Sequence, residues 1–240
     1  MIAYCALDLG SGRRVERDAD AVVPAASTIK VLLSAAFWEA AEEGAIDPGA
    51  RIRAGEAAAA GGGGLLESLD PETAPTLADL DLLMLSVSDN AATNALIEVV
   101  GYERPNALAT ALGLGATALR RRMMDADAAD RGEDNTTSAS DLVRLLEAIA
   151  RADGVSARTS RRIVAALLQS QHTDITARHL SAPSRLVACK QGMLDGVLHD
   201  AALIDDGRRR VALAVMSRPA AAPEALARLA ARAYAAVTSP

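Results

Sequence analysis

A serine and a lysine three positions apart begin a mainly hydrophobic stretch of the chain. Ser27 and Lys30 precede a run of apolar residues that extends to Trp38. Positions i and i+3 share one face of a helix. A serine hydroxyl is a weak nucleophile until a base removes its proton, and burial favours the neutral amine of a lysine. The pair therefore indicates nucleophilic catalysis; a helix cap beside an unrelated lysine is the alternative for this motif alone.

The choice of basic residues points to the same lysine. Lys and Arg together number 25, but only Lys30 and Lys190 are lysines. Arginine stays protonated in proteins, whereas a buried lysine can give up its proton. A chain that uses arginine for nearly every positive charge is expected to keep lysine where arginine cannot replace it. Both lysines are therefore candidate functional residues.

Two further motifs carry groups suited to the same chemistry. Ser88 and Asn90 flank an aspartate at a break between two helical runs, and they offer a hydroxyl for proton relay and an amide for substrate binding. Lys190, Gln191 and Gly192 lie at the end of a predicted strand, where a lysine can attract a carboxylate and glycine permits close approach. Taken separately, the first is equally typical of a turn with a helix cap, and the second of an exposed strand end.

Together the motifs occur in the order Ser-x-x-Lys, Ser-Asp-Asn and Lys-x-Gly. This arrangement resembles the class A β-lactamase and penicillin-binding protein family. The resemblance spans nearly the whole chain, including the hairpin before the first motif and the strands and helix after the third. It implies a serine hydrolase that forms an acyl-enzyme with a small β-lactam, or with a D-alanyl-type amide or ester, and that needs no cofactor.

The resemblance also assigns roles to the matching positions. It makes Ser27 the nucleophile and Lys30 its general base or proton carrier, while Ser88 becomes the proton shuttle to the leaving nitrogen. Asn90 is implied to bind the substrate amide and to steady Lys30. Lys190 is implied to attract the substrate carboxylate.

Several positions near the third motif complete or modify this pattern. The backbone N–H groups of Ser27 and Met193 would form the oxyanion hole. Gln191 replaces the family's usual threonine or serine, and its amide can still donate to a carboxylate. His199 falls near the place of an arginine that binds this carboxylate in many members, with a structural role as the alternative. The glycines at 61–64 lack a large aromatic neighbour, which predicts an open site.

A long segment without clear periodicity, residues 116–137, departs further from the family. Members carry Arg-x-Glu there, and the glutamate activates the water that releases the acyl group. Here the sequence after Arg122 has no glutamate two positions later. Asp125, Asp127 and Glu133 are possible substitutes. The motif set thus predicts acylation, and the loop predicts a long-lived adduct and weak turnover.

Hydrophobic periodicity places the motifs on a mixed scaffold. Strand-like runs cover residues 2–8 and 13–18 at the start of the chain, and 185–190, 199–204 and 209–216 near its end. Helices are expected at 27–44, 77–87, 91–100, 105–112, 138–151, 156–169 and 223–236.

Two N-terminal strands cannot form a stable sheet alone, so they are expected to join the three C-terminal strands. The predicted fold class is α/β (α+β): a three-layer β-lactamase-like sandwich in which helices flank a five-stranded antiparallel sheet, plus an all-helical lobe. We expect a single domain over 1–240. Residues 1–26 with 180–240 would form the α/β lobe, and 27–179 the helical lobe.

Composition limits the partners. A formal net charge of −6 argues against nucleic acid. Cys5 and Cys189 are expected to be buried free thiols, with no metal site, and no apolar stretch is long enough to span a bilayer. We expect a monomer, cytoplasmic as the sequence is written, because no signal peptide is seen, or secreted if a leader has been removed.

Three functions remain open at this stage. One is a β-lactamase-like hydrolase that turns over, and another is a D-alanyl peptidase or esterase relative. The third is a non-enzymatic penicillin-binding or sensor domain that stays acylated. All three require acylation at Ser27, and the loop near Asp125 distinguishes them.

Overall fold

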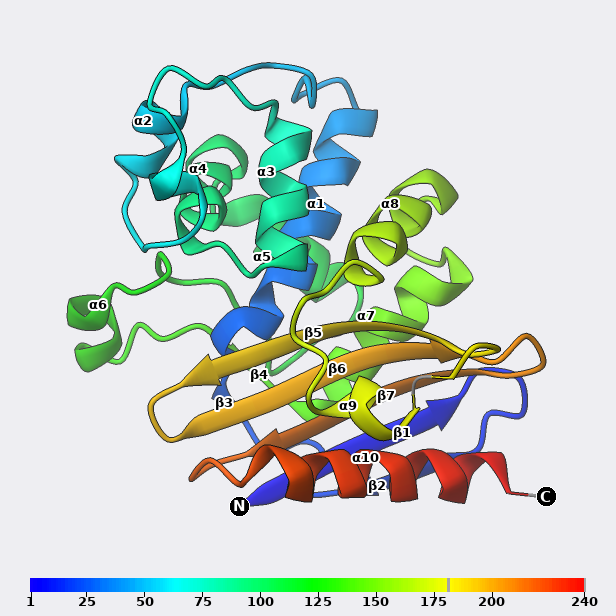
Figure 1. The fold of residues 1–240 in the computed structure, drawn as a ribbon. Coiled ribbons are helices and arrows are strands. Elements are labelled where there is room, and N and C mark those ends of the chain that lie inside the picture. The colour runs from blue at the N-terminus through cyan, green and yellow to red at the C-terminus, as the bar shows by residue number, and fades with distance from the viewer. Residues whose placement is uncertain (181, 240) are drawn as a thin grey trace.

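The computed structural model describes residues 1–180 and 182–239, and a five-stranded antiparallel sheet lies at its centre (Figure 1). The strand order is β2-β1-β7-β6-β5, so the strands from the start of the chain pair with those from its end. The predicted fold class is confirmed. The strands are β1 (Ile2–Asp8), β2 (Arg14–Arg17), β5 (Leu186–Leu194), β6 (Val197–Asp205) and β7 (Arg210–Ser217).

The first and last strands pair along their whole length. Ile2 lies opposite Ser217, and just beyond this pair the amine of Met1 donates to the carbonyl oxygen of Arg218 at 2.6 Å. Residues 211–217 of the central strand β7 are all buried. The start of the chain therefore completes a sheet whose middle is made near its end.

Helices cover both faces of the sheet (Figure 1). The C-terminal helix α10 (Pro223–Thr238) and the short α9 (Thr176–Leu180) lie along one face, while α7 (Ala139–Arg151) and α8 (Ala157–Leu167) lie over the other. In the described part of the chain, no helix is both long enough and apolar enough to cross a membrane. The helices of the adjoining lobe are α1 (Lys30–Glu42), α2 (Ala54–Ala58), α3 (Leu77–Ser86), α4 (Asn90–Val100), α5 (Glu103–Ala111) and α6 (Ala126–Asp130).

Helix α1 is the central helix of this lobe. Ten of its thirteen residues are buried, because α3, α4, α5 and α8 pack around it. A helix that is apolar on nearly all sides is typical of such a position. The packing fixes the first residue of the helix, Lys30, inside the protein.

Two details of the predicted element pattern are wrong. The strand predicted at 185–190 continues to Leu194, because its later residues pair with β6 and the chain turns only at 195–196. Gln191 and Gly192 thus lie inside a strand and not at its end. The segment 116–137 contains structure too: α6, and a two-residue strand β4 (Thr136–Thr137) that pairs with β3 (Val23–Pro24) just before Ser27.

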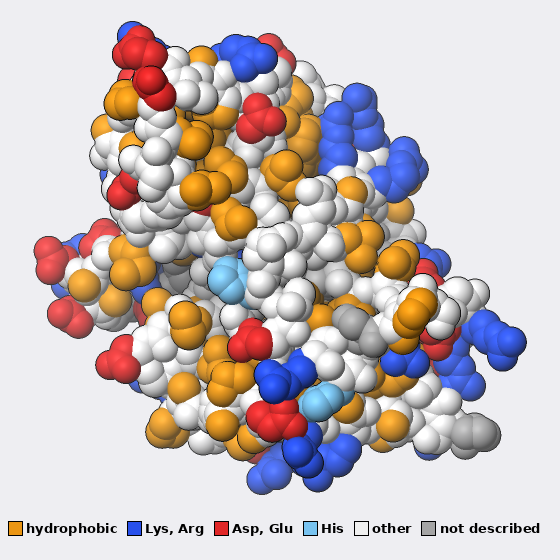
Figure 2. All heavy atoms as spheres, viewed as in Figure 1, with side chains coloured by type: hydrophobic (Ala, Val, Ile, Leu, Met, Phe, Trp, Pro, Cys, Tyr) orange, Lys and Arg blue, Asp and Glu red, His pale blue; other side chains and the backbone are white. Residues whose placement is uncertain are grey.

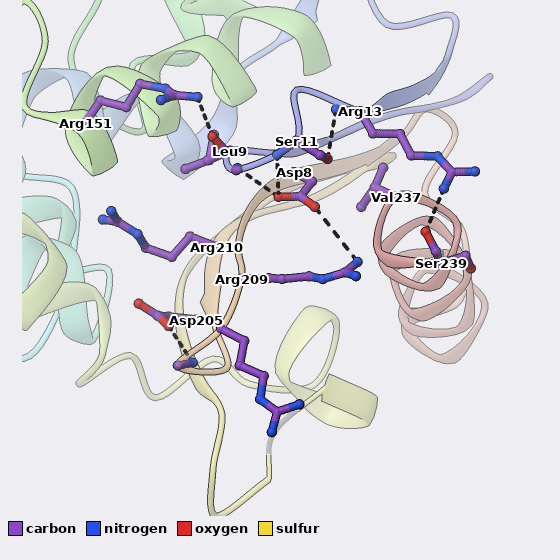
Figure 3. A pocket seen from close by; sticks show the side chains of 13 residues that line it. Asp8, Leu9, Ser11, Arg13, Arg151, Asp205, Arg209, Arg210, Val237 and Ser239 are labelled. Atoms are coloured by element: carbon purple, nitrogen blue, oxygen red, sulfur yellow. Dashed lines mark hydrogen bonds and ion pairs between the residues drawn. The ribbon is translucent and has the colours of Figure 1, made fainter.

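A cavity of about 790 Å³ lies where β6 ends and β7 begins, at the opposite end of β6 from His199 (Figure 3). Several arginines line it, and they face the carbonyl ends of helices, which carry partial negative charge. Nη1 of Arg210 donates to the Ala150 carbonyl of α7 at 2.9 Å, and Nη1 of Arg13 donates to the Ser239 carbonyl after α10 at 2.7 Å. The helix ends account for the positions of Arg13, Arg209 and Arg210.

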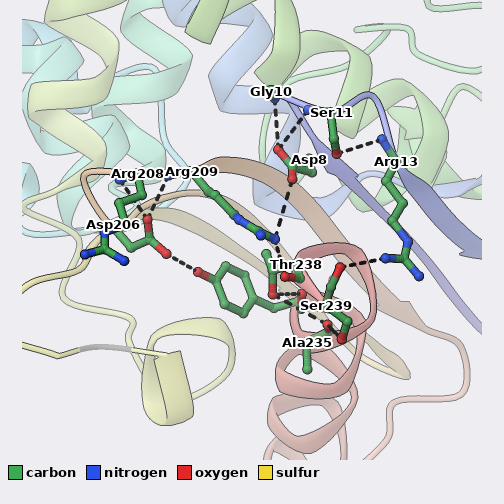
Figure 4. A network of polar contacts seen from close by, with 11 residues as sticks. Asp8, Gly10, Ser11, Arg13, Asp206, Arg208, Arg209, Ala235, Thr238 and Ser239 are labelled. Carbon is green, nitrogen blue, oxygen red and sulfur yellow. Dashed lines mark hydrogen bonds and ion pairs between the residues drawn. The ribbon is translucent and has the colours of Figure 1, made fainter.

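The same polar network holds α10 in place (Figure 4). The Tyr234 hydroxyl donates to Oδ2 of Asp206 at 2.9 Å, and Arg209 donates to the carbonyl of Thr238. These contacts join the β6–β7 turn to the last helix.

Elsewhere in the sheet, Cys5 and the other cysteine, Cys189, are buried free thiols, as predicted.

Candidate active site

Ser27 lies in a tight 3₁₀ turn between β3 and α1. The turn spans Ala26–Ile29, and its first residue has a φ of 48°, a left-handed conformation that residues other than glycine rarely adopt. Two hydrogen bonds hold the preceding residue: Ala25 N–H donates to the Asn135 carbonyl at 2.7 Å, and Thr28 Oγ1 donates to the Ala25 carbonyl at 2.6 Å. The nucleophile candidate is therefore held on a constrained backbone.

The serine borders a small cavity of about 40 Å³. Asn90, from the second sequence motif, and Met193, which follows the third, line the same cavity, so the fold brings all three motifs together. The full lining is Ala26, Ser27, Asn90, Arg121, Met123, Met124, Asn135, Met193 and Leu194.

Lys30 links the first motif to the second. Its Nζ lies 2.7 Å from the Ser88 carbonyl oxygen, 3.1 Å from Ser88 Oγ and 2.7 Å from Asn90 Oδ1. Of these three groups, only the Ser88 hydroxyl can both accept and donate a proton. The lysine is thus aimed at a hydroxyl that can pass a proton onward.

The electrostatic surroundings favour the neutral form of this lysine. Burial, together with the ammonium of Lys190, lowers the pKa of Lys30 well below its ordinary value, and the carboxylate of Asp89 opposes this only in part. The side chain of Lys30 is fully buried. A buried lysine with a depressed pKa is suited to accept a proton near neutral pH.

Ser88 and its neighbours are positioned by an unusual backbone. Ser88 has a φ of 60° at the junction of α3 and α4, and Asp89 caps α4 by accepting from Ala92 N–H at 2.8 Å. The second carboxylate oxygen of Asp89 accepts from Leu66 N–H at 2.8 Å. A Cβ at Gly64 would lie 2.5 Å from this carboxylate, so the glycine-rich segment is closely packed against the motif and is not a free connector.

The second lysine reaches the site from β5. Lys190 is fully buried, and its Nζ donates to the Gln191 carbonyl at 3.2 Å. Burial lowers the pKa of Lys190 to about 8, while Asp200 acts in the opposite direction. The group is therefore close to half-protonated in mildly alkaline solution.

Gly192 allows β5 to approach the nucleophile turn. A Cβ at this position would lie 3.1 Å from Thr28 Cγ2 and 3.2 Å from the Ala25 carbonyl oxygen. These distances are shorter than most real Cβ contacts, so any larger residue would push the strand away from Ser27. The next side chain, Met193, is 69% exposed beside the cavity.

Gln191 does not point toward Lys30. Successive side chains of a strand alternate between its faces, so Gln191 lies on the α9–α10 side of the sheet, opposite Asp200. Its Nε2 donates to Oδ1 of Asp174 at 2.8 Å. The amide that was expected to receive a substrate carboxylate is already engaged with an acid.

His199 is held inside the sheet by both ring nitrogens. Nε2 lies 3.0 Å from the Pro24 carbonyl oxygen, and Nδ1 accepts from Ser217 N–H at 3.3 Å. Because a carbonyl only accepts, Nε2 must carry the proton. Burial lowers the pKa of His199, which keeps the ring neutral. These contacts favour the structural alternative for this histidine, which joins β6 to the strand before Ser27.

The irregular loop is closed by Arg121 and not by its neighbour Arg122. Nη2 of Arg121 pairs with Oδ1 of Asp134 at 2.8 Å, whereas Arg122 pairs with Glu98 on the surface. Counted from Arg121, the residue two positions later is Met123, which is 8% exposed and lines the cavity with Ser27.

The acidic residues considered for release of the acyl group do not reach this cavity. Asp125 caps α6 by accepting from Ala128 N–H at 2.9 Å, and Asp127 is exposed on the same short helix. Glu133 pairs with Arg131 on the surface. None of the three lines the space beside Ser27. The described residues also contain no group of His, Cys, Asp and Glu that could hold a metal ion.

Sequence reasoning did not single out two asparagines that shape the site. Asn94 binds the backbone of Met123 on both its N–H and its carbonyl, and Asn135 accepts from the N–H groups of Arg120 and Arg121. Asn94 lies four positions after Asn90, on the next turn of α4, which is the signal that could have indicated it.

Comparison with known proteins agrees with this geometry. Residues 2–237 match a family model described as the beta-lactamase enzyme family. Among solved structures, a β-lactamase from Sphaerobacter thermophilus has a TM-score of 0.90 at 24% identity, covering 99% of this chain and 91% of that one. An ancestral class A β-lactamase has a TM-score of 0.85 at 23% identity, covering 96% and 92%.

A third similar structure is a variant of PBP-A, with a leucine replaced by glutamate, in an acyl-enzyme complex with penicillin G. Its TM-score is 0.85 at 27% identity, and the match covers 98% of this chain and 88% of that chain. No match was found among curated protein sequences.

Proposed function

Because the chain belongs to the beta-lactamase enzyme family and is a serine β-lactamase-like hydrolase, we propose that Ser27 is the residue acylated by its substrate. The observation that carries this proposal is the position of Lys30 Nζ, within 3.1 Å of Ser88 Oγ and 2.7 Å of Asn90 Oδ1, beside the cavity that Ser27 lines. These groups supply the base, relay and amide-binding contact that acyl transfer requires.

Acylation begins with loss of the Ser27 proton. As Ser27 Oγ bonds to the substrate carbonyl carbon, neutral Lys30 accepts the proton at Nζ. The depressed pKa of Lys30 supports this role. The negative charge that develops on the carbonyl oxygen is received by the backbone N–H groups of Ser27 and Met193.

The intermediate then collapses and its C–N bond breaks. The ammonium of Lys30 returns its proton through Ser88 Oγ to the leaving nitrogen, so Lys30 is neutral again and the acyl group stays on Ser27. A neutral amine has two N–H donors, and the Ser88 carbonyl and Asn90 Oδ1, each 2.7 Å away, match them. The lone pair is then left for the Ser27 proton, and the ammonium that results has a third N–H for Ser88 Oγ at 3.1 Å.

The substrate we propose is a β-lactam. Lys190, charged below its pKa of about 8, attracts the carboxylate beside the scissile amide. Gln191 contributes less than the family pattern implies, because its amide already donates to Asp174. Weaker anchoring of the carboxylate favours modest acylation rates.

Release of the acyl group is the slow step. It requires a base that holds water against the ester, and the buried side chain nearest this place in the loop is the thioether of Met123. A thioether neither takes a proton nor orders water strongly. General-base assistance is worth about 10²–10⁴-fold in rate, so we propose that the adduct is long-lived and turnover weak. The same observation favours, as a second candidate, a penicillin-binding sensor that remains acylated.

Intact-mass spectrometry after mixing with penicillin G tests both candidates. We expect a stoichiometric adduct on the wild type and none on Ser27→Ala. Slow decay with release of the opened product identifies a weak hydrolase, and an adduct stable over days identifies the sensor. Rapid turnover with no visible adduct contradicts slow release. If no adduct and no hydrolysis occur, a D-alanyl peptide or simple ester takes the place of the β-lactam in the same assay.

A further inference from the structure

A second concave site lies between α8 and the edge of the sheet. Its volume is 480 Å³, within the range of pockets that hold small molecules. Leu168 and Leu186, on its two sides, are 39% and 60% exposed, which is unusual for large aliphatic side chains facing one another. On the face shown in Figure 2, hydrophobic side chains gather where α8 lies over the sheet. The apolar lining includes Val164, Ala165, Leu168, Leu186, Ala188 and Leu203.

One polar atom in this groove lacks a partner. Ser160 lines the groove and is only 7% exposed, and its Oγ makes no hydrogen bond within the described chain. A buried hydroxyl without a partner costs free energy. This oxygen is shielded from solvent as it stands, but rotation about the Cα–Cβ bond would turn it toward the groove. A ligand oxygen there would accept its hydrogen bond and remove this cost, so the hydroxyl points to a ligand with a polar end.

The groove also carries positive charge in a protein whose net charge is −6. Arg161 lines it, is exposed, and makes no hydrogen bond or ion pair with any residue that the structure describes. Arg210 lies at the other end with Nη1 donating to the Ala150 carbonyl at 2.9 Å. Asp205 is the one acid in the lining, and its Oδ1 accepts from Gly207 N–H. An anionic group is therefore favoured beside an apolar wall.

We propose that this groove binds a small amphiphile: an aliphatic chain along α8 and β5, ending in one carboxylate that pairs with Arg161 and accepts from Ser160. Planar guanidinium groups match carboxylates with two parallel hydrogen bonds. Each buried methylene adds hydrophobic free energy, so a medium-length chain binds measurably without further polar contacts. A fatty carboxylate is the ligand class that combines both features.

The site is separate from the cavity at Ser27, since the two share no lining residue. The groove and the Ser27 cavity do share strand β5. Leu186 and Ala188 lie on the same face of β5 as Lys190, because side chains two apart point the same way. An occupant of the groove would rest on the strand that presents Lys190, without entering the nucleophile cavity. The proposal does not depend on the reaction at Ser27.

Isothermal titration calorimetry with sodium decanoate tests the proposal on the full chain. We expect saturable one-to-one binding to the wild type and at least tenfold weaker binding to Arg161→Glu. Arg158→Glu is the matched control: it makes the same charge change on the same helix outside the groove, and it should bind as the wild type does. Ala165→Phe, which fills the groove, should abolish binding.

Decanol separates the charged contact from the apolar one. We expect it to bind at least tenfold more weakly than decanoate to the wild type and equally to Arg161→Glu. No heat of binding up to millimolar decanoate would overturn the proposal. Equal loss of binding in Arg158→Glu and Arg161→Glu would also overturn it. If Ala165→Phe fails to fold, as judged by circular dichroism, the comparison of the two arginine variants still decides the outcome.

Discussion

The side-chain amide of Asn94 holds the backbone of Met123 from both sides: Met123 N–H donates to Oδ1 at 2.7 Å, and Nδ2 donates to the Met123 carbonyl at 3.2 Å. The same Nδ2 lies 2.9 Å from the Gly61 carbonyl oxygen. Asn94 is 1% exposed, so these bonds are shielded from water. The position of Met123 beside Ser27 is thus fixed, whatever side chain that residue carries.

Replacing this methionine with a carboxylate should supply the missing base. We expect Met123→Glu to shorten the lifetime of the penicillin adduct by about 10²-fold or more, because general-base assistance is worth about 10²–10⁴-fold. Mass spectrometry over time measures this lifetime from the loss of the adduct. Met124→Glu is the comparison variant: Met124 also lines the cavity, but it is 64% exposed and, among the described residues, no hydrogen bond joins its backbone to Asn94, so its carboxylate should shorten the lifetime much less. Equal lifetimes in Met123→Glu and wild type would remove this position from the release step.

Lys30→Arg should abolish acylation while the protein stays folded. A guanidinium keeps the positive charge but cannot accept the Ser27 proton. Reaction with a fluorescent penicillin, followed on a gel, gives the rate, and thermal unfolding checks the fold. A variant that labels at nearly the wild-type rate would show that Lys30 is not the base.

Asp125→Asn should leave the adduct lifetime within about threefold of wild type, since Asp125 caps α6 and does not line the cavity. Asparagine is as good a helix cap as aspartate, so the loop should stay intact. The decay of the Ser27 adduct, followed by mass spectrometry, measures this lifetime. A large increase in lifetime would instead identify Asp125 as the base for acyl release.

A buried carboxyl far from the site should govern part of the acid dependence of stability. Burial raises the pKa of Asp81 to about 6, and the hydrogen bond from Trp38, whose Nε1 donates to Oδ2 at 2.8 Å, opposes this shift in part. The charged neighbour is Arg162, which stacks on the Trp38 ring at 3.8 Å. Because the folded pKa exceeds the unfolded value of about 3.9, the stabilisation from Asp81 is complete below that value and is lost as pH rises through 6.

Asp81→Asn should remove this dependence. Relative to the variant, the free energy of unfolding of the wild type should fall between about pH 4 and pH 6 and then stay level. Above that range the Asp81 carboxyl is ionised in both the folded and the unfolded protein. Urea titrations of both proteins at four pH values measure the difference. A difference that does not change with pH would show that Asp81 titrates normally.

The chemistry of the first two motifs was predictable because it depends on residue types at short spacing. Ser27 with Lys30, and Ser88 with Asn90, belong to short segments whose local structure follows from helix periodicity and turn residues. Their approach to one another was implied by the family resemblance, and contacts of 2.7–3.1 Å at Lys30 Nζ are what the fold adds.

The residue that closes the segment 116–137 was harder to predict from the sequence. Three arginines in succession give three choices for the residue that closes it, and only the pairing with Asp134 selects Arg121. Counting two positions from Arg122 leads to Met124, one position too far along, and Asp125, considered as a substitute, lies one position further still. Likewise Gly192 was taken as the end of a strand, although it continues β5; the close approach of Thr28, which requires glycine there, is a long-range contact that local sequence does not encode.

The pairing of β1 with β7 also determines when this protein can fold as it is made. Residues 2–8 are translated long before their partner strand at 211–217, and Met1 bonds to a residue 217 positions away. Until then β1 has only the short β2 beside it, and an isolated two-stranded hairpin is marginally stable. Contacts this distant in sequence slow folding. Until β7 is made, one edge of β1 stays unpaired, and an unpaired strand edge is prone to aggregate.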